Sequence, residues 1–104
     1  MPDLQVIIER LEAIKGRKGM YFGQRAEDGE TFLNGFCAAL MATGVPMTWD
    51  SWRATTQRRG WKWDSCGFLP DMKTKGLHDE AIMDELIDSL AEELRRIARE
   101  EAGK

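Results

Sequence analysis

Tryptophan and arginine are concentrated in one stretch of this 104-residue chain, where RRGWKW occupies positions 58–63. Both residue types are favoured at the energetic centres of protein interfaces, because each buries a large area while keeping a polar group available. The same combination can stack on nucleic-acid bases and neutralise phosphates. The sequence therefore predicts a partner-binding surface made of Arg53, Arg58, Arg59, Trp61, Lys62 and Trp63.

Two alternatives accompany this interpretation. One or both tryptophans complete the core while the basic side chains simply face water, or the basic segment 53–75 binds nucleic acid. A sequence pI near 5.2 argues against dominant affinity for nucleic acid, so we expect a protein partner first.

The remaining candidates for chemistry are Cys66 and His78, as a nucleophile and its base. No recognisable orienting group or oxyanion hole accompanies them, and His78 is better interpreted as the residue that caps the last helix. Cys37 and Cys66 lack a CxxC spacing, so we expect reduced thiols in the core. With a single histidine the chain offers no recognisable zinc set. We therefore expect no catalysis, no metal and no cofactor.

Charge is segregated along the chain. Residues 53–78 carry six basic and two acidic side chains, and residues 79–104 carry four basic and nine acidic ones. The acidic helix expected at the C-terminal end is a second candidate for binding, as a mimic of nucleic acid that enters a basic groove. The competing interpretation is a solvated face with i,i+4 pairs such as Glu92–Arg96.

Helical periodicity and capping residues predict the elements that carry these side chains. We expect helices from Asp3 to Lys15, from Asp28 to Thr43, from Thr48 or Asp50 to Arg59, and over 79–102. Residues 61–69 are expected to form a loop held by aromatic side chains, followed by one helical turn over 70–75. The prediction is an all-α, compact single-domain bundle (1–104) of four main helices, with an aromatic-rich loop before the last helix and with 28–43 at the centre of the core.

The chain shows no apolar run long enough to span a membrane and no signal-peptide layout at its start. We therefore expect a cytoplasmic protein without membrane contact, whose oligomeric state the sequence leaves open.

The stretch RKGMYFG at 17–23 lies between the first two expected helices. Its glycines permit tight backbone turns. We interpret it as a structural latch, in which Met20, Tyr21 and Phe22 fold inward while Arg17 and Lys18 stay solvated.

Residues 11–23, LEAIKGRKGMYFG, resemble the N-terminal motif of the DNA gyrase B-type ATPases, with Lys18 in place of that family's proline. The resemblance implies ATP binding by a Glu-x-x-Asp-Asn helix. Glu30 and Asn34 have the matching separation, but Leu33 replaces the Asp, Glu30 lies closer to the motif than in that family, and its later nucleotide motifs are missing. The turn also resembles that of small uncharacterised bacterial and phage proteins.

In size, acidity and tryptophan content the chain is similar in character to phage-encoded inhibitors, including anti-CRISPR proteins. The favoured hypothesis is a non-enzymatic protein that covers a protein partner by steric occlusion. The alternatives are a nucleic-acid-binding regulator that uses segment 53–75, and a small nucleotide-binding protein or enzyme.

Overall fold

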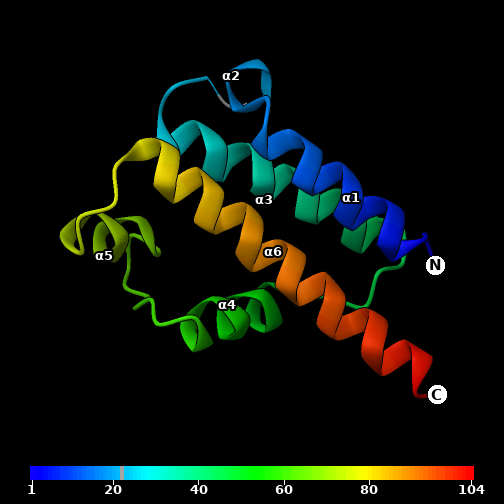
Figure 1. Cartoon of the computed structure of the whole chain (residues 1–104). Coiled ribbons are helices and arrows are strands. Elements are labelled where there is room, and N and C mark those ends of the chain that lie inside the picture. The colour runs from blue at the N-terminus through cyan, green and yellow to red at the C-terminus, as the bar shows by residue number, and fades with distance from the viewer. Residues whose placement is uncertain (22) are drawn as a thin grey trace.

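The computed structural model describes residues 1–21 and 23–104, and over these residues the chain forms six helices (Figure 1). The helices are α1 (Leu4–Lys15), α2 (Lys18–Tyr21), α3 (Ala26–Ala42), α4 (Trp49–Arg58), α5 (Leu69–Thr74) and α6 (Asp79–Ala102). No strand occurs in this described part, which holds only an isolated bridge between Asp64 and Gly67. The all-α prediction is confirmed. The count of helices is six rather than four main ones, since α2 and α5 are short additions.

Capping side chains set the starts of two helices. The Asp3 carboxylate accepts hydrogen bonds from the backbone N–H groups of Gln5 and Val6, and Thr48 and Ser51 form a reciprocal capping box at the start of α4. His78 occupies the N-cap position of α6, but its side chain makes no capping hydrogen bond. The prediction was right about its position and wrong about its capping role.

Packing, rather than capping, sets the start of α3. The helix begins at Ala26, two residues before the expected Asp28. Arg25 occupies the N-cap position, but its side chain makes no capping hydrogen bond. Ala26 is fully buried, so the extra half-turn adds apolar contact to the core.

The centre of the core is α6, not the segment 28–43. This helix packs against α1, α3, α4 and α5, and Figure 1 shows it crossing between the pair α1 and α3 and the pair α4 and α5. Four of its apolar side chains have no exposed surface: Ile82, Ile87, Leu90 and Leu94. A helix that must bury side chains against several neighbours needs a broad apolar face, which α6 has.

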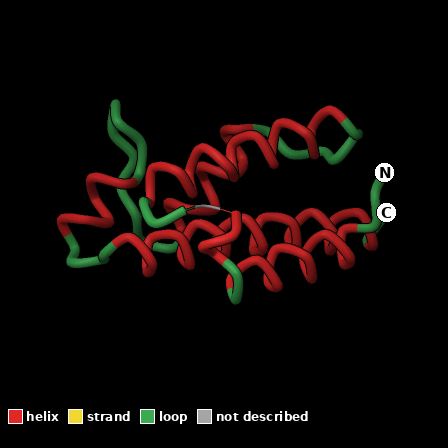
Figure 2. The backbone as a smooth tube through the Cα atoms, turned by 90° about the horizontal axis from the view of Figure 1, so that it is seen from above, coloured by secondary structure: helices red, strands yellow, loops and turns green. Residues whose placement is uncertain are grey.

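The neighbours α1 and α4 both run antiparallel to α6. In α1, Glu12 pairs with Arg95 and the later residue Lys15 pairs with the earlier residue Asp88 of α6. The two helices therefore run in opposite directions. The N- and C-termini consequently lie at the same end of the molecule (Figure 2).

The latch between the first two long helices differs from its prediction. Met20 is 76% exposed and Tyr21 is 46% exposed, while Phe22 lies outside the described residues. Lys18, expected in water, is largely buried and donates hydrogen bonds to Asp84 Oδ1 at 2.7 Å and to the Lys15 carbonyl at 2.9 Å. The turn is therefore fastened to α6 by an ion pair, and the Tyr21 ring packs edge to face on Phe32 of α3, with 5.9 Å between ring centres.

The two cysteines are free thiols in different surroundings. Cys37 is buried on α3, as expected. Cys66 is exposed, so its prediction as a core residue was wrong. The tight turn of residues 64–67, in which the Asp64 carboxylate accepts a hydrogen bond from the Cys66 backbone N–H, keeps Cys66 outside the core.

Candidate protein-binding site

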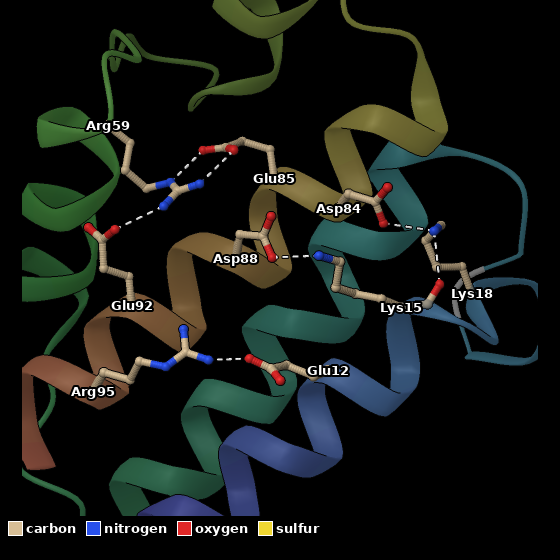
Figure 3. A network of polar contacts seen from close by, with 9 residues as sticks. All are labelled: Glu12, Lys15, Lys18, Arg59, Asp84, Glu85, Asp88, Glu92 and Arg95. Atoms are coloured by element: carbon tan, nitrogen blue, oxygen red, sulfur yellow. Dashed lines mark hydrogen bonds and ion pairs between the residues drawn. The ribbon is translucent and has the colours of Figure 1, made fainter.

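The six residues predicted to bind a partner lie in three different surroundings. Arg59 and Trp61 are fastened to α6. Figure 3 shows the Arg59 side chain reaching the Glu85 carboxylate, to which it donates hydrogen bonds of 2.6 and 2.9 Å, with a further bond of 2.9 Å to Glu92. The Trp61 indole N–H donates to Glu85 at 2.8 Å.

The contact of Arg59 and Trp61 with Glu85 is strongly polar and only partly accessible to solvent. Burial favours the neutral form of Glu85, but hydrogen bonds from Arg59 and Trp61 outweigh it and lower the pKa of that carboxyl. The Lys75 ammonium lies 5.2 Å from the centre of the Trp61 ring and covers part of it. Arg59 and Trp61 therefore hold the 61–68 loop against α6 and present little free surface.

Trp63 and Arg53 lie in a second place, at a cavity walled by aromatic rings. The Trp63 ring meets Phe68 edge to face, with 5.0 Å between ring centres, and the Arg53 guanidinium carbon lies 4.3 Å from the centre of the Trp63 ring. Trp63 is 44% exposed.

The tryptophan cavity, as we call this hollow, measures about 80 Å³. Its aromatic lining consists of Trp49, Trp52, Trp63 and Phe68, and its polar lining consists of Glu30, Asn34, Arg53 and Thr56. Leu86 of α6 completes it. Helices α3, α4 and α6 and the 61–68 loop therefore all contribute to one site.

Gly67 allows the loop to close over this cavity. Its φ of +86° lies in the left-handed region that favours glycine. A Cβ at this position would stand 3.6 Å from the Glu30 carboxylate and from the Trp63 ring, which is ordinary van der Waals contact. A substitution here is therefore unfavourable because of the backbone conformation and not because of a clash with these neighbours.

Two residues of the cavity lining also carry buried donors that lack partners. Among the described residues, two buried side-chain nitrogens make no hydrogen bond, and both belong to the cavity lining: Trp52 Nε1 and Arg53 Nε. Leaving a buried donor unpaired costs about 1–3 kcal/mol. Both nitrogens are enclosed within the fold and are not open to the cavity, so this cost falls on the packing of α4 beside the site.

Glu30 carries a further unbalanced charge. It makes no hydrogen bond or ion pair with any described residue, and burial, reinforced by the nearby Glu27 charge, raises its pKa although the Lys73 charge opposes the shift. A partly buried carboxylate with a perturbed pKa and no direct hydrogen bond is a functional-site candidate.

Arg58 and Lys62 lie in the third kind of surroundings. Lys62 places its side chain in water, while its backbone N–H donates to Asp71 at 2.8 Å. Arg58 lines a groove between α4 and α6 instead of the tryptophan cavity. The structure therefore brings together Arg53 and Trp63 and separates the other four predicted residues from them.

The acidic face of α6 is largely neutralised within the fold. Asp84 pairs with Lys18, Asp88 with Lys15, and Glu85 and Glu92 with Arg59 (Figure 3). The expected Glu92–Arg96 pair is wrong: Arg96 pairs with Glu93 and Glu100. A face whose charges are already paired is a poor mimic of a nucleic-acid backbone.

The other candidates for chemistry stay apart. No hydrogen bond joins Cys66 and His78, and the structure, over the residues it describes, holds no group of three metal-ligating side chains. In the described part of the chain, no helix combines the length and the apolar character that crossing a membrane requires.

Sequence reasoning missed most of the cavity. Trp49 and Trp52 were not predicted as partner-binding residues, and Glu30 and Asn34 were noted only for their resemblance to a nucleotide site. The i,i+3 spacing of two tryptophans was the available signal, since it places both rings on one side of α4.

No family model matches the chain, and neither the curated proteins nor the solved structures contain a match to it.

Proposed function

We propose that this protein is a non-enzymatic binding protein that covers the surface of a protein partner, with the tryptophan cavity at the centre of the contact. One observation carries the proposal: two half-exposed tryptophans, Trp49 and Trp63, border a cavity whose lining also holds the partly buried Glu30 carboxylate, which makes no hydrogen bond or ion pair with a described residue.

The energetics favour a protein partner at this surface. Trp49 is 45% exposed and Trp63 is 44% exposed, so each keeps a large apolar area in water. Covering that area contributes about 25 cal/mol per Å². Interface hot spots are enriched in tryptophan and arginine and sit in pockets that a partner's side chain fills. A cavity of about 80 Å³ has room for one side-chain end group.

The same size argues against nucleotide binding at Glu30 and Asn34, the residues to which the family resemblance points. Pockets that hold drug-sized ligands have volumes of about 300–1,000 Å³. The cavity beside Glu30 and Asn34 has about 80 Å³ and therefore does not accommodate a nucleotide.

Charge pairing weakens the nucleic-acid alternative. Four of the six basic side chains in segment 53–78 make ion pairs within the chain: Arg53, Arg59, Lys73 and Lys75. Arg58 and Lys62 alone in this segment lack a carboxylate partner among the described residues. Because nucleic-acid affinity grows with the number of phosphates neutralised, two free cations support only weak binding.

In the proposed complex, a partner side chain enters the cavity and meets the rings of Trp49 and Trp63. Its polar end supplies a donor for the Glu30 carboxylate. The body of the helical domain then blocks the surrounding surface of the partner, which is steric occlusion.

The test is affinity capture from native lysate treated with nuclease, with wild type and the Trp49→Ala/Trp63→Ala variant. We expect one stoichiometric protein partner that binds the variant at least about thirtyfold more weakly, since a hot-spot residue contributes about 2 kcal/mol or more.

Tyr21→Ala is the matched control. Tyr21 is an aromatic residue that is 46% exposed, and it lies on α2, away from the cavity lining. Retention of the partner by the control and its loss from the double variant support the proposal. A partner that is released by nuclease, or one captured equally by all three proteins, overturns it.

A further inference from the structure

A second hollow, the arginine groove, lies between α4 and α6 and measures about 950 Å³. It shares no lining residue with the tryptophan cavity. Its lining contains five arginines: Arg58, Arg59, Arg95, Arg96 and Arg99. Three acids, Asp88, Glu92 and Glu100, also line it, so the groove is locally basic on a chain whose net charge is −3.

A buried carboxylate fixes two of these arginines. Glu93, whose side chain is fully buried, accepts hydrogen bonds of 2.8 and 2.9 Å from Arg96 and one of 2.8 Å from the Thr55 hydroxyl. Arg58 in turn donates to the same Thr55 hydroxyl at 2.8 Å. Arg58 and Arg96 are therefore oriented by one network that begins at the floor of the groove.

The charges of the groove are incompletely balanced. Arg59 pairs with Glu85 and Glu92, Arg95 pairs with Glu12, and Arg96 pairs with Glu93 and the exposed Glu100. Arg58 and Arg99 have no carboxylate partner in the part of the chain that the structure describes. Two guanidinium groups are thus available to an anion, with Arg96 held beside them.

We propose that the arginine groove binds the phosphate groups of a small phosphorylated molecule, with Arg58 and Arg99 neutralising the charge. The planar guanidinium matches phosphate oxygens through two parallel hydrogen bonds, and prior orientation reduces the entropy lost on binding. The volume of the groove lies in the range of small-molecule sites.

The lining also favours a small phosphorylated molecule over single-stranded nucleic acid. Proteins that bind single strands stack successive bases on aromatic side chains. The lining of the arginine groove includes no aromatic residue.

The test is isothermal titration calorimetry with inorganic pyrophosphate at constant ionic strength. We expect saturable binding to wild type, at least about tenfold weaker in Arg58→Gln/Arg99→Gln, because two charge-assisted contacts are lost. The matched control is Arg10→Gln/Arg17→Gln, which removes two exposed arginines outside the groove and should bind as wild type does. Absence of saturable binding, or equal weakening in both variants, overturns the proposal.

Two further arms separate the sources of phosphate and the two sites. The protein should bind inorganic phosphate more weakly than pyrophosphate. Its affinity for a ten-nucleotide single strand, counted per phosphate group, should not exceed its affinity for pyrophosphate. Binding of the oligonucleotide alone overturns the proposal in favour of nucleic acid. Trp49→Ala/Trp63→Ala should bind pyrophosphate normally, so failure of this inference and failure of the proposed protein contact are distinguishable.

Discussion

Arg59, at the C-terminal end of α4, donates two hydrogen bonds of 2.6 and 2.9 Å to the carboxylate of Glu85 on α6. The same carboxylate accepts the indole N–H of Trp61. Arg59 thus joins the basic middle segment to the acidic last helix, whereas Arg53, Lys73 and Lys75 pair with carboxylates outside that helix. Because most charges of both segments are paired within the fold, the few unpaired charged groups are the informative ones.

The Arg59–Glu85 pair predicts a measurable coupling. Arg59→Met should lower the free energy of unfolding by about 1–3 kcal/mol, because it leaves a partly buried carboxylate without its charged donor. Urea denaturation of Arg59→Met, Glu85→Gln and the double variant should give an interaction energy of at least about 0.5 kcal/mol.

Arg10→Met serves as the control, since Arg10 is exposed on α1 and should change stability by no more than about 0.5 kcal/mol. Strictly additive effects of the Arg59 and Glu85 substitutions would show that the pair contributes nothing of its own.

Glu93 predicts a loss of stability in acid. Burial favours its neutral form, but hydrogen bonds from Arg96, Ser51 and Thr55 outweigh burial and lower its pKa. The unfolded chain therefore takes up the Glu93 proton first as the pH falls, and the stabilisation present above the unfolded pKa of about 4.3 disappears below it.

Unfolding free energies measured by urea denaturation between pH 7 and pH 3 test this. Wild type should lose stability over the acid limb, and Glu93→Gln should start lower at pH 7 and show a shallower limb. Parallel curves for the two proteins would rule out Glu93 as a contributor.

The ion pair that fastens α2 predicts an unusual ranking at the 17–23 turn. Lys18→Met should destabilise the protein, because it removes the hydrogen bonds to Asp84 and to the Lys15 carbonyl. Met20→Ala should be close to neutral, since Met20 is mostly exposed. The midpoint temperatures of thermal unfolding of the two variants check this ranking. A larger loss of stability in Met20→Ala than in Lys18→Met would instead support a latch made by inward-facing side chains.

The long helices were predictable because local signals agree with packing. Asp3 and Thr48 cap the ends that periodicity indicates, and the apolar stripe of α6 repeats over its whole length. The start of α3 was missed by two residues because burial of Ala26 replaces a capping signal there.

The candidate site was predictable only in part, because side-chain direction in short segments depends on distant partners. Arg53 and Trp63 lie together, but Arg59 and Trp61 turn toward Glu85, which is more than twenty positions away in the sequence. In the 17–23 turn, Lys18 reaches inward to Asp84, while Met20 stays largely exposed. Nothing in the local pattern of either segment encodes these long-range choices.

The two thiols should differ in reactivity. Burial, reinforced by the Glu93 charge, raises the pKa of Cys37 to about 12, whereas Cys66 is exposed. A thiol reagent such as iodoacetamide should therefore modify one cysteine in the native protein and both in urea. Peptide mapping should place the native modification at Cys66, and equal labelling of both positions would contradict the packing of α3.

The most direct test of the account is photo-crosslinking from the tryptophan cavity. A benzophenone amino acid in place of Asn34, an exposed residue of the cavity lining, should crosslink to a single protein in native lysate. The same amino acid in place of Gln5, exposed on α1 and outside the cavity, should not. Crosslinking from position 34 alone is the predicted result, whereas equal products from both positions, or a product from position 5 alone, would contradict a partner-binding role for this cavity.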